Sequence, residues 1–184
     1  MGNHSSKLCI AGDDILLIKS LIDRTSIAEI LLDFSGKASL LETDIAYFSD
    51  PSSRPWIAYT KSLPVTATLE AYVQIAIDLA RTYYEHLDVR LGSPFRYNEY
   101  GTGHGYKLHV DRSNNASHLR VREVSVVVGL NDDYTGGELS FPRQKTDVKV
   151  GAGDILMFPS CYTHPHEVAP VSSGVRKTVV TWLS

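Results

Sequence analysis

Three residues in the second half of the chain could bind one divalent metal ion. His109 and Asp111 flank Val110 in an apolar segment that we predict to be a strand. Side chains alternate across a strand, so positions 109 and 111 should share a face. A buried carboxylate is costly unless it is paired or bound to metal. With His166 they would form the two-histidine, one-carboxylate triad of non-haem iron(II) oxygenases. Taken alone, the His-x-Asp pair could equally be a surface histidine beside an aspartate at a strand end.

Two histidines compete to be the third ligand, because His164 and His166 have the same strand parity. We favour His166, which lies ten residues before Arg176. His164 is then expected at the rim of the site, near substrate. His104, in a glycine-rich turn, is a second candidate for the rim.

The last predicted strand carries an arginine that should point inward. Arg176 and Thr178 share parity, while Lys177 between them should point outward. An inward guanidinium needs an anionic partner, and its planar fork suits a carboxylate. The distal carboxylate of 2-oxoglutarate would be a natural partner, with the Thr178 hydroxyl as a second donor. The alternative is an ion pair with an aspartate or glutamate of the protein.

The first half of the chain should supply supporting elements. We predict a strand at residues 15–19 and helices at about 26–34 and 68–86. Ser26 and Glu29 have the spacing of a capping box, and Gly36 follows the end of the first helix. Apolar residues recur at helical spacing through the second helix, which predicts one buried face. Residues 49–55 indicate a surface loop.

The second half should be mostly β. Short runs rich in valine, tyrosine, threonine and phenylalanine alternate with turn signals, at residues 95–100, 106–111, 121–130, 138–141, 147–150, 155–158, 166–168 and 176–183. This pattern predicts an antiparallel sandwich or jelly roll, with the N-terminal helices packed on the outside of one sheet. We expect a single α+β domain over residues 1–184. Residues 1–90 would support a mainly β catalytic core at about 91–184.

From about residue 95 onward the chain resembles the Fe(II)- and 2-oxoglutarate-dependent oxygenases of the prolyl 4-hydroxylase type, whose core is a double-stranded β-helix. The blocks that carry the resemblance occur in family order: Arg96-Tyr97-Asn98-Glu99-Tyr100-Gly101-Thr102-Gly103, His109-Val110-Asp111, Arg122-Glu123-Val124-Ser125, Gly129-Leu130-Asn131, Gly136-Gly137-Glu138-Leu139-Ser140-Phe141-Pro142, Gly153-Asp154-Ile155-Leu156-Met157-Phe158-Pro159-Ser160, His166-Glu167-Val168 and Gly174-Val175-Arg176.

The resemblance implies roles for particular residues. His109, Asp111 and His166 correspond to the iron ligands, and Arg176, with Thr178, to the group that binds 2-oxoglutarate. Tyr100 stands where such enzymes often place a second co-substrate contact, although it could simply fill the barrel mouth.

The resemblance also implies a reaction and its cofactors. Fe(II), 2-oxoglutarate and O2 would be required, and ascorbate is expected by analogy. Hydroxylation of an aliphatic C–H bond would yield succinate and CO2. One departure from the family concerns Gly129, because some relatives carry a tyrosine at that position; the change removes one co-substrate contact.

Two substrate classes are compatible with these residues. The resemblance favours a prolyl residue in a peptide or protein, and a free amino acid or small metabolite is the alternative. Trp56, in the stretch 49–60, could line a substrate groove or anchor the core. A non-catalytic, cupin-like metal-binding barrel and a zinc hydrolase are competing classes. A metal-binding barrel would not need an inward-facing Arg176. A zinc hydrolase would need a general base, and this sequence has no motif that would place one.

The composition of the chain indicates which classes of partner and which cellular compartment to expect. The net charge of −3 offers no electrostatic footprint for nucleic acid, so we expect none. No apolar run approaches the ~20 residues of a membrane span, and no signal peptide is visible. Two cysteines do not make a disulfide framework, which favours the cytoplasm. Gly2 begins a weak N-myristoylation pattern.

Overall fold

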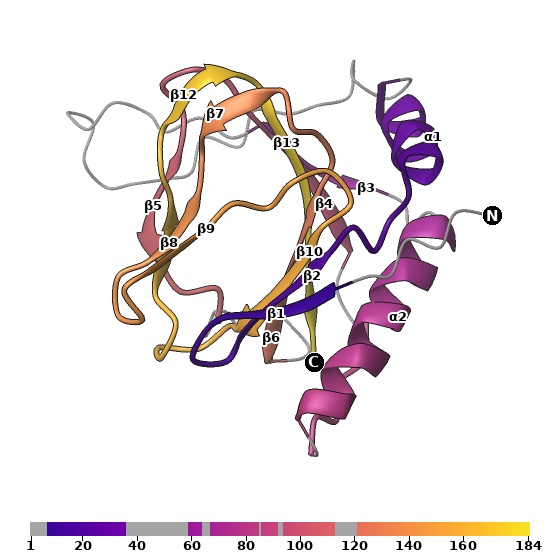
Figure 1. Ribbon diagram of the computed structural model, residues 1–184, viewed down its shortest axis with the longest axis vertical. Helices are drawn as coiled ribbons and strands as arrows, with labels where there is room; N and C mark the ends of the chain where they lie inside the picture. The colour runs from indigo at the N-terminus through magenta and orange to yellow at the C-terminus, as the bar shows by residue number, and fades with distance from the viewer. Residues whose placement is uncertain (1–6, 36–58, 64–66, 85, 92–93, 113–120) are drawn as a thin grey trace.

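The computed structural model describes residues 7–35, 59–63, 67–84, 86–91, 94–112 and 121–184. Within these ranges the chain forms thirteen strands and two helices (Figure 1). Neither helix is long and apolar enough to cross a bilayer. The pattern at Gly2 and the predicted groove residue Trp56 lie outside the described residues.

A seven-stranded major sheet forms one wall of the molecule. Every neighbouring pair in it is antiparallel. Strands from the first 63 residues add to both of its edges, so the two halves of the sequence share one sheet. In spatial order the strands are β1 (Lys7–Gly12), β2 (Ile15–Lys19), β10 (Ile155–Pro159), β6 (Val124–Gly129), β13 (Arg176–Leu183), β4 (Phe95–Tyr100) and β3 (Tyr59–Leu63).

The opposite wall is built from shorter strands. A four-stranded minor sheet has the order β5 (Tyr106–His109), β11 (His166–Val168), β8 (Leu139–Phe141) and β9 (Thr146–Val148). A two-stranded ribbon joins β7 (Tyr134–Gly136) to β12 (Val171–Gly174). Buried apolar residues from both walls form one core cluster between them. The predicted jelly roll is therefore confirmed.

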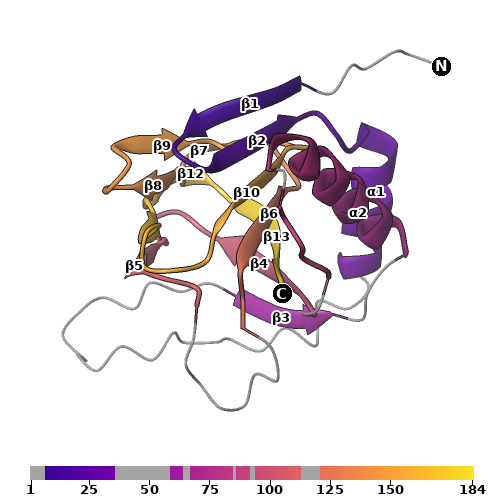
Figure 2. The same cartoon turned by 90° about the horizontal axis from the view of Figure 1, so that it is seen from below.

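The two helices cover the outer face of the major sheet. In α1 (Arg24–Ser35) and α2 (Ala67–Tyr83), apolar residues at helical spacing face the same core cluster as one side of the major-sheet strands. Figure 2 shows both helices on one side of this sheet and β5, β8 and β9 on the other. The prediction that the N-terminal helices pack on one sheet is confirmed.

Some local predictions were wrong. α1 begins at Arg24, because the Asp23 carboxylate accepts hydrogen bonds from the backbone N–H groups of Thr25 and Ser26 at 2.9 and 3.0 Å. Asp23, not Ser26, is the N-cap. Four strands were missed, namely β1, β3, β7 and β12. β3 begins at Tyr59, within the stretch 49–60 where we placed a possible substrate groove, and β12 covers Val171–Gly174, between two strands that we did predict.

Candidate metal centre

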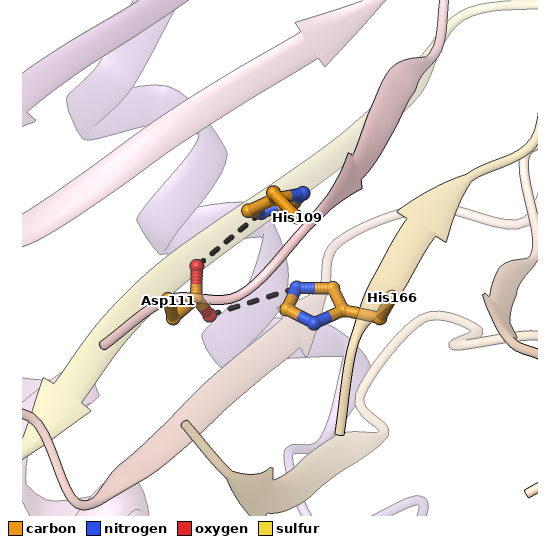
Figure 3. Close-up of side chains that lie close together, drawn as sticks. All are labelled: His109, Asp111 and His166. Atoms are coloured by element: carbon orange, nitrogen blue, oxygen red, sulfur yellow. Dashed lines mark ion pairs between the residues drawn. The ribbon is translucent and has the colours of Figure 1, made fainter. Parts of the chain in front are cut away.

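The three predicted metal ligands lie together between the two walls (Figure 3). His109 ends β5, His166 begins β11, and the two residues are paired in register. The Asp111 carboxylate reaches both imidazoles: Oδ1 lies 3.3 Å from Nε2 of His109 and Oδ2 lies 3.6 Å from Nε2 of His166. One ligand atom from each residue falls within 4.8 Å of the others.

Strand alternation does not explain how Asp111 reaches the site. β5 ends at His109, so Asp111 lies in a bend after the strand, contrary to our prediction of one strand over 106–111. The bend is held by backbone contacts. Arg122 donates from Nη1 to the Asp111 carbonyl at 3.2 Å, and the Arg112 N–H donates to the Ser160 carbonyl at 2.8 Å. These contacts, from the segment before β6 and the segment after β10, therefore aim the carboxylate.

Each imidazole is oriented by a backbone carbonyl. Nδ1 of His109 contacts the Lys107 carbonyl at 2.8 Å, and Nδ1 of His166 contacts the His164 carbonyl at 3.1 Å. When Nδ1 donates to a carbonyl, the Nε2 lone pair is left for a metal. Burial also lowers the pKa of His166, although the Asp111 charge opposes this effect. Both features favour the neutral imidazole that metal binding needs.

The Asp111 carboxylate is stabilised in its ionised form. Ser125 donates from Oγ to Oδ2 at 2.6 Å, and the Ser160 hydroxyl lies 2.7 Å from that of Ser125. Burial alone would raise the pKa of the Asp111 carboxyl. The hydrogen bond from His109, the two histidine charges and the Ser125 hydroxyl together hold that pKa well below its usual range. A divalent cation would replace the histidine charges as the partner of this anion.

The donor set therefore fits a transition metal. Two imidazole nitrogens and one carboxylate oxygen converge from one side, and such a triad leaves further coordination positions for other ligands. Phe158 and Phe141 pack against His166, with ring centroids 4.7 and 5.7 Å from the imidazole. These rings form an apolar wall beside the site, which shields bound groups from water.

Arg176 and Thr178 lie buried on the inner face of β13. The Arg176 side chain is 2% exposed, and Nη1 lies 3.4 Å from the Thr178 hydroxyl. Its Nε and Nη2 have no hydrogen-bond partner, and the ion pairs among the described residues do not include it. A buried guanidinium without an acidic partner is costly, so its surroundings suit an anionic ligand.

Two tyrosines and a glycine surround this arginine. The Tyr100 ring lies 5.3 Å from Cζ of Arg176, and burial raises the pKa of Tyr100 to about 12 although the Arg176 charge opposes this. Burial also raises the pKa of Tyr134, again against the charge of Arg176. A Cβ at Gly137 would lie 2.9 Å from Cδ of Arg176, so the residue is glycine partly to admit the arginine.

Backbone contacts hold the two histidines that we predicted at the rim of the site. His164 is buried, not at a rim: Nδ1 contacts the Thr163 hydroxyl and Nε2 contacts the Asp13 carbonyl, both at 2.8 Å. His104 is half-buried, and its Nδ1 accepts a hydrogen bond from the Gly101 N–H within its own turn.

The glycine that departs from the family pattern has a structural cause. A Cβ at Gly129 would lie 2.0 Å from the carbonyl oxygen of Gly151. The backbone of the segment before β10 thus occupies the space that a side chain at position 129 would need.

Sequence reasoning missed the buried hydroxyl pair Ser125–Ser160 and the tyrosine Tyr134. A polar Ser125 inside the run Val124–Gly129 was a signal for the first. The sequence held no comparable signal for Tyr134, because its proximity to Arg176 arises between distant segments.

Comparison with known proteins gives a consistent result. Residues 95–184 match the model of the 2OG-Fe(II) oxygenase superfamily. A PKHD-type hydroxylase of Psychrobacter sp. is 35% identical over 98 residues, which are 49% of this chain and 37% of that protein. A PKHD-type hydroxylase of Synechococcus sp. is 40% identical over 85 residues, 44% of this chain and 36% of that protein. The match thus spans less than half of these relatives.

Solved structures share the fold over a larger part of the chain. The viral collagen prolyl hydroxylase of Paramecium bursaria Chlorella virus-1, in its 2OG complex, has a TM-score of 0.69 at 18% identity and covers 94% of this chain and 96% of that one. A Trichoplax adhaerens prolyl hydroxylase, bound to a hypoxia inducible factor peptide fragment, has a TM-score of 0.71 at 20% identity, covering 92% and 83%.

Proposed function

We propose that this chain, whose residues 95–184 match the model of the 2OG-Fe(II) oxygenase superfamily, is a 2-oxoglutarate-dependent iron(II) hydroxylase of that superfamily. The observation that carries the proposal is the pairing of two features in one interior. A histidine–aspartate–histidine cluster lies there, and so does a buried arginine that forms no ion pair within the part of the chain that the structure describes. A metal store or a zinc hydrolase would account for the first feature only.

His109, Asp111 and His166 would hold the iron, and Arg176 with Thr178 would bind the distal carboxylate of 2-oxoglutarate. Bound iron, 2-oxoglutarate and O2 would supply the oxidising power for hydroxylating an unactivated C–H bond, with release of succinate and CO2. The chain's own residues bind and orient. Thr178 fixes the guanidinium from one side and Tyr100 covers it from another. The phenylalanines beside His166 exclude water from the reacting groups.

For the substrate, we propose a prolyl residue of a peptide or protein. The PKHD-type hydroxylases and the prolyl hydroxylases of the same fold support this choice. A free amino acid is the alternative substrate class. We further propose that residues 1–184 act as one domain, because β1, β2 and β3 complete the sheet that carries Arg176. Ascorbate would keep the iron reduced.

The first test is an anaerobic titration of the Fe(II)-loaded protein with 2-oxoglutarate, followed by its weak visible absorption. Arg176→Ala should raise the apparent Kd for 2-oxoglutarate by about 10- to 100-fold, the equivalent of a charge-assisted hydrogen bond. Iron affinity should stay unchanged. Lys177→Ala, at the neighbouring position on β13, removes the same charge and is the matched control. Equal affinity of Arg176→Ala and wild type for 2-oxoglutarate would show that the co-substrate assignment is wrong.

A further inference from the structure

His164 is a buried histidine that lies two residues before the ligand His166 and is not itself part of the triad. Its side chain belongs to the core, with 3% of the residue exposed. Nε2 lies 2.8 Å from the Asp13 carbonyl, and Nδ1 lies 2.8 Å from the Thr163 hydroxyl. A carbonyl can only accept, so in the neutral ring Nε2 carries the proton and Nδ1 accepts from Thr163. Both ring nitrogens are therefore held.

The contact with Asp13 ties His164 to the N-terminal hairpin. Asp13 lies in the turn between β1 and β2, 151 residues from His164 in the sequence. This turn is outside residues 95–184, the part of the chain that matches the superfamily model. The hairpin itself is fixed to the major sheet, because β2 pairs with β10. The hairpin thus connects the major sheet to the segment between β10 and β11.

The backbone of His164 carries this connection to the metal centre. Its carbonyl lies 3.1 Å from Nδ1 of His166 and accepts the proton that leaves Nε2 of that ligand free for a metal. His164 also precedes Pro165, and a residue before proline is restricted to extended conformations. With so little backbone freedom, the direction of the His164 carbonyl depends on where the His164 ring is anchored.

We propose that His164 is a positioning residue of the metal centre: its ring, held by the turn of the β1–β2 hairpin, fixes the carbonyl that orients His166. The inference rests on the metal centre of the proposed function and deepens it. It gives the N-terminal hairpin a part in metal binding in addition to its place in the sheet. The role belongs to the hydrogen bonds of the ring and not to its bulk alone.

Two substitutions separate the hydrogen bonds of His164 from its volume. His164→Leu keeps an apolar group of similar size but cannot donate to the Asp13 carbonyl. His164→Gln can donate from Nε2 to that carbonyl and accept from Thr163 through Oε1. Competition titration of the full chain with Zn(II) should show about 10-fold weaker binding for His164→Leu, as for other lost outer contacts of a metal ligand. His164→Gln should recover most of the affinity. His86→Leu, the same change at an exposed histidine, should bind like wild type.

A spectroscopic signature distinguishes positioning from a general loss of stability. In the Co(II)-loaded chain, proton NMR resolves the Nδ1–H protons of histidine ligands and their exchange with water. His164→Leu should speed exchange at His166, whose acceptor is the His164 carbonyl. The proton of His109, whose acceptor is the Lys107 carbonyl, should be unaffected and is the internal control. Wild-type Zn(II) affinity in His164→Leu, equal acceleration of both protons, or no recovery in His164→Gln would overturn the positioning role.

These measurements do not involve 2-oxoglutarate, so they keep the two proposals distinct. If the wild type fails to bind 2-oxoglutarate but His164→Leu still weakens Zn(II) binding at His166, the proposed function fails and the positioning role stands. If Arg176→Ala loses affinity for 2-oxoglutarate while His164→Leu binds Zn(II) like wild type, the proposed function stands and the positioning role is wrong.

Discussion

At the scale of single residues, the position of Asp111 is the least expected feature of the metal centre. It follows the end of β5, so the pleat of the strand does not direct its side chain. The hydroxyls of Ser125 and Ser160 are completely buried and form a chain that ends on Oδ2. Because Ser125 donates to Asp111, the Ser160 hydroxyl is left to donate to Ser125. Ser125 is therefore a positioning residue for the carboxylate.

Replacing Ser125 should weaken metal binding more than it weakens the fold. In Ser125→Ala the carboxylate loses its oriented donor, and loss of such outer contacts typically costs about 10- to 100-fold in metal affinity. Ser125→Thr should restore most of the affinity. Competition titration with Zn(II) or Mn(II) measures the effect, and Ser172→Ala, at an exposed position on β12, is the control. Metal affinity of Ser125→Ala equal to wild type would refute the positioning role.

At the scale of elements, α1 and α2 are joined through the cap of α1. The Asp23 carboxylate accepts from the Tyr72 hydroxyl of α2 at 2.7 Å and from the Ser26 hydroxyl at 2.8 Å. The backbone hydrogen bond from Ser26, followed by the Tyr72 and Ser26 hydroxyls, holds the pKa of Asp23 well below its usual value. The charge of Asp23 therefore stabilises the folded state above the unfolded pKa of about 3.9.

The pH dependence of stability should reveal this charge. In Asp23→Asn, the side-chain amide oxygen can still accept hydrogen bonds from the backbone N–H groups at the start of α1, but the side chain carries no charge. We expect wild type to be more stable than Asp23→Asn at pH 7. The difference should shrink as the pH falls below about 4. Urea unfolding at a series of pH values measures it, with the exposed Asp147→Asn as control. A difference that stays constant down to pH 2 would contradict the charged cap.

At the scale of the whole molecule, the major sheet separates two cores. Its outer face packs against α1 and α2, and its inner face packs against the minor sheet around the metal centre. Stability and metal binding should therefore be separable by mutation. The site depends on the inner face, while much of the buried apolar surface belongs to the outer one.

Ile77 on α2 tests this separation, because it is fully buried in the outer core. Ile77→Ala should lower the free energy of unfolding by about 2–5 kcal/mol, as expected for a large-to-small change in a core. Below the unfolding temperature its metal affinity should match wild type. Ile75→Ala, 45% exposed on the same helix, should change stability by less than about 0.5 kcal/mol. Metal affinity that falls in step with stability would show that the two cores are coupled.

The local pattern of the sequence was enough to predict much of the fold. Alternation predicted β4 and β13 with their bounds, and helical spacing predicted α2 to within a few residues. These features depend on neighbours along the chain, which a sequence displays directly. Of the missed strands, β7 and β12 are short and β3 is poor in apolar residues, whereas β1 contains an apolar run, Leu8 to Ala11, that we did not use. Each pairs with a partner strand that its own residues do not specify.

The residues of the candidate site also fall into two groups, those that the sequence predicted and those that only the tertiary structure revealed. The residue types and their spacing were sufficient to identify the cluster of His109, Asp111 and His166 and to predict Arg176 as an inward cation. The sequence alone left His164 and His166 equivalent in parity. The choice of His166 rested on its spacing to Arg176. The tertiary structure separates the two by their contacts, because His166 pairs with His109 while His164 is held by the Asp13 carbonyl, 151 residues away in the chain. Which polar groups meet across such distances is decided by packing, since no period along the sequence records it.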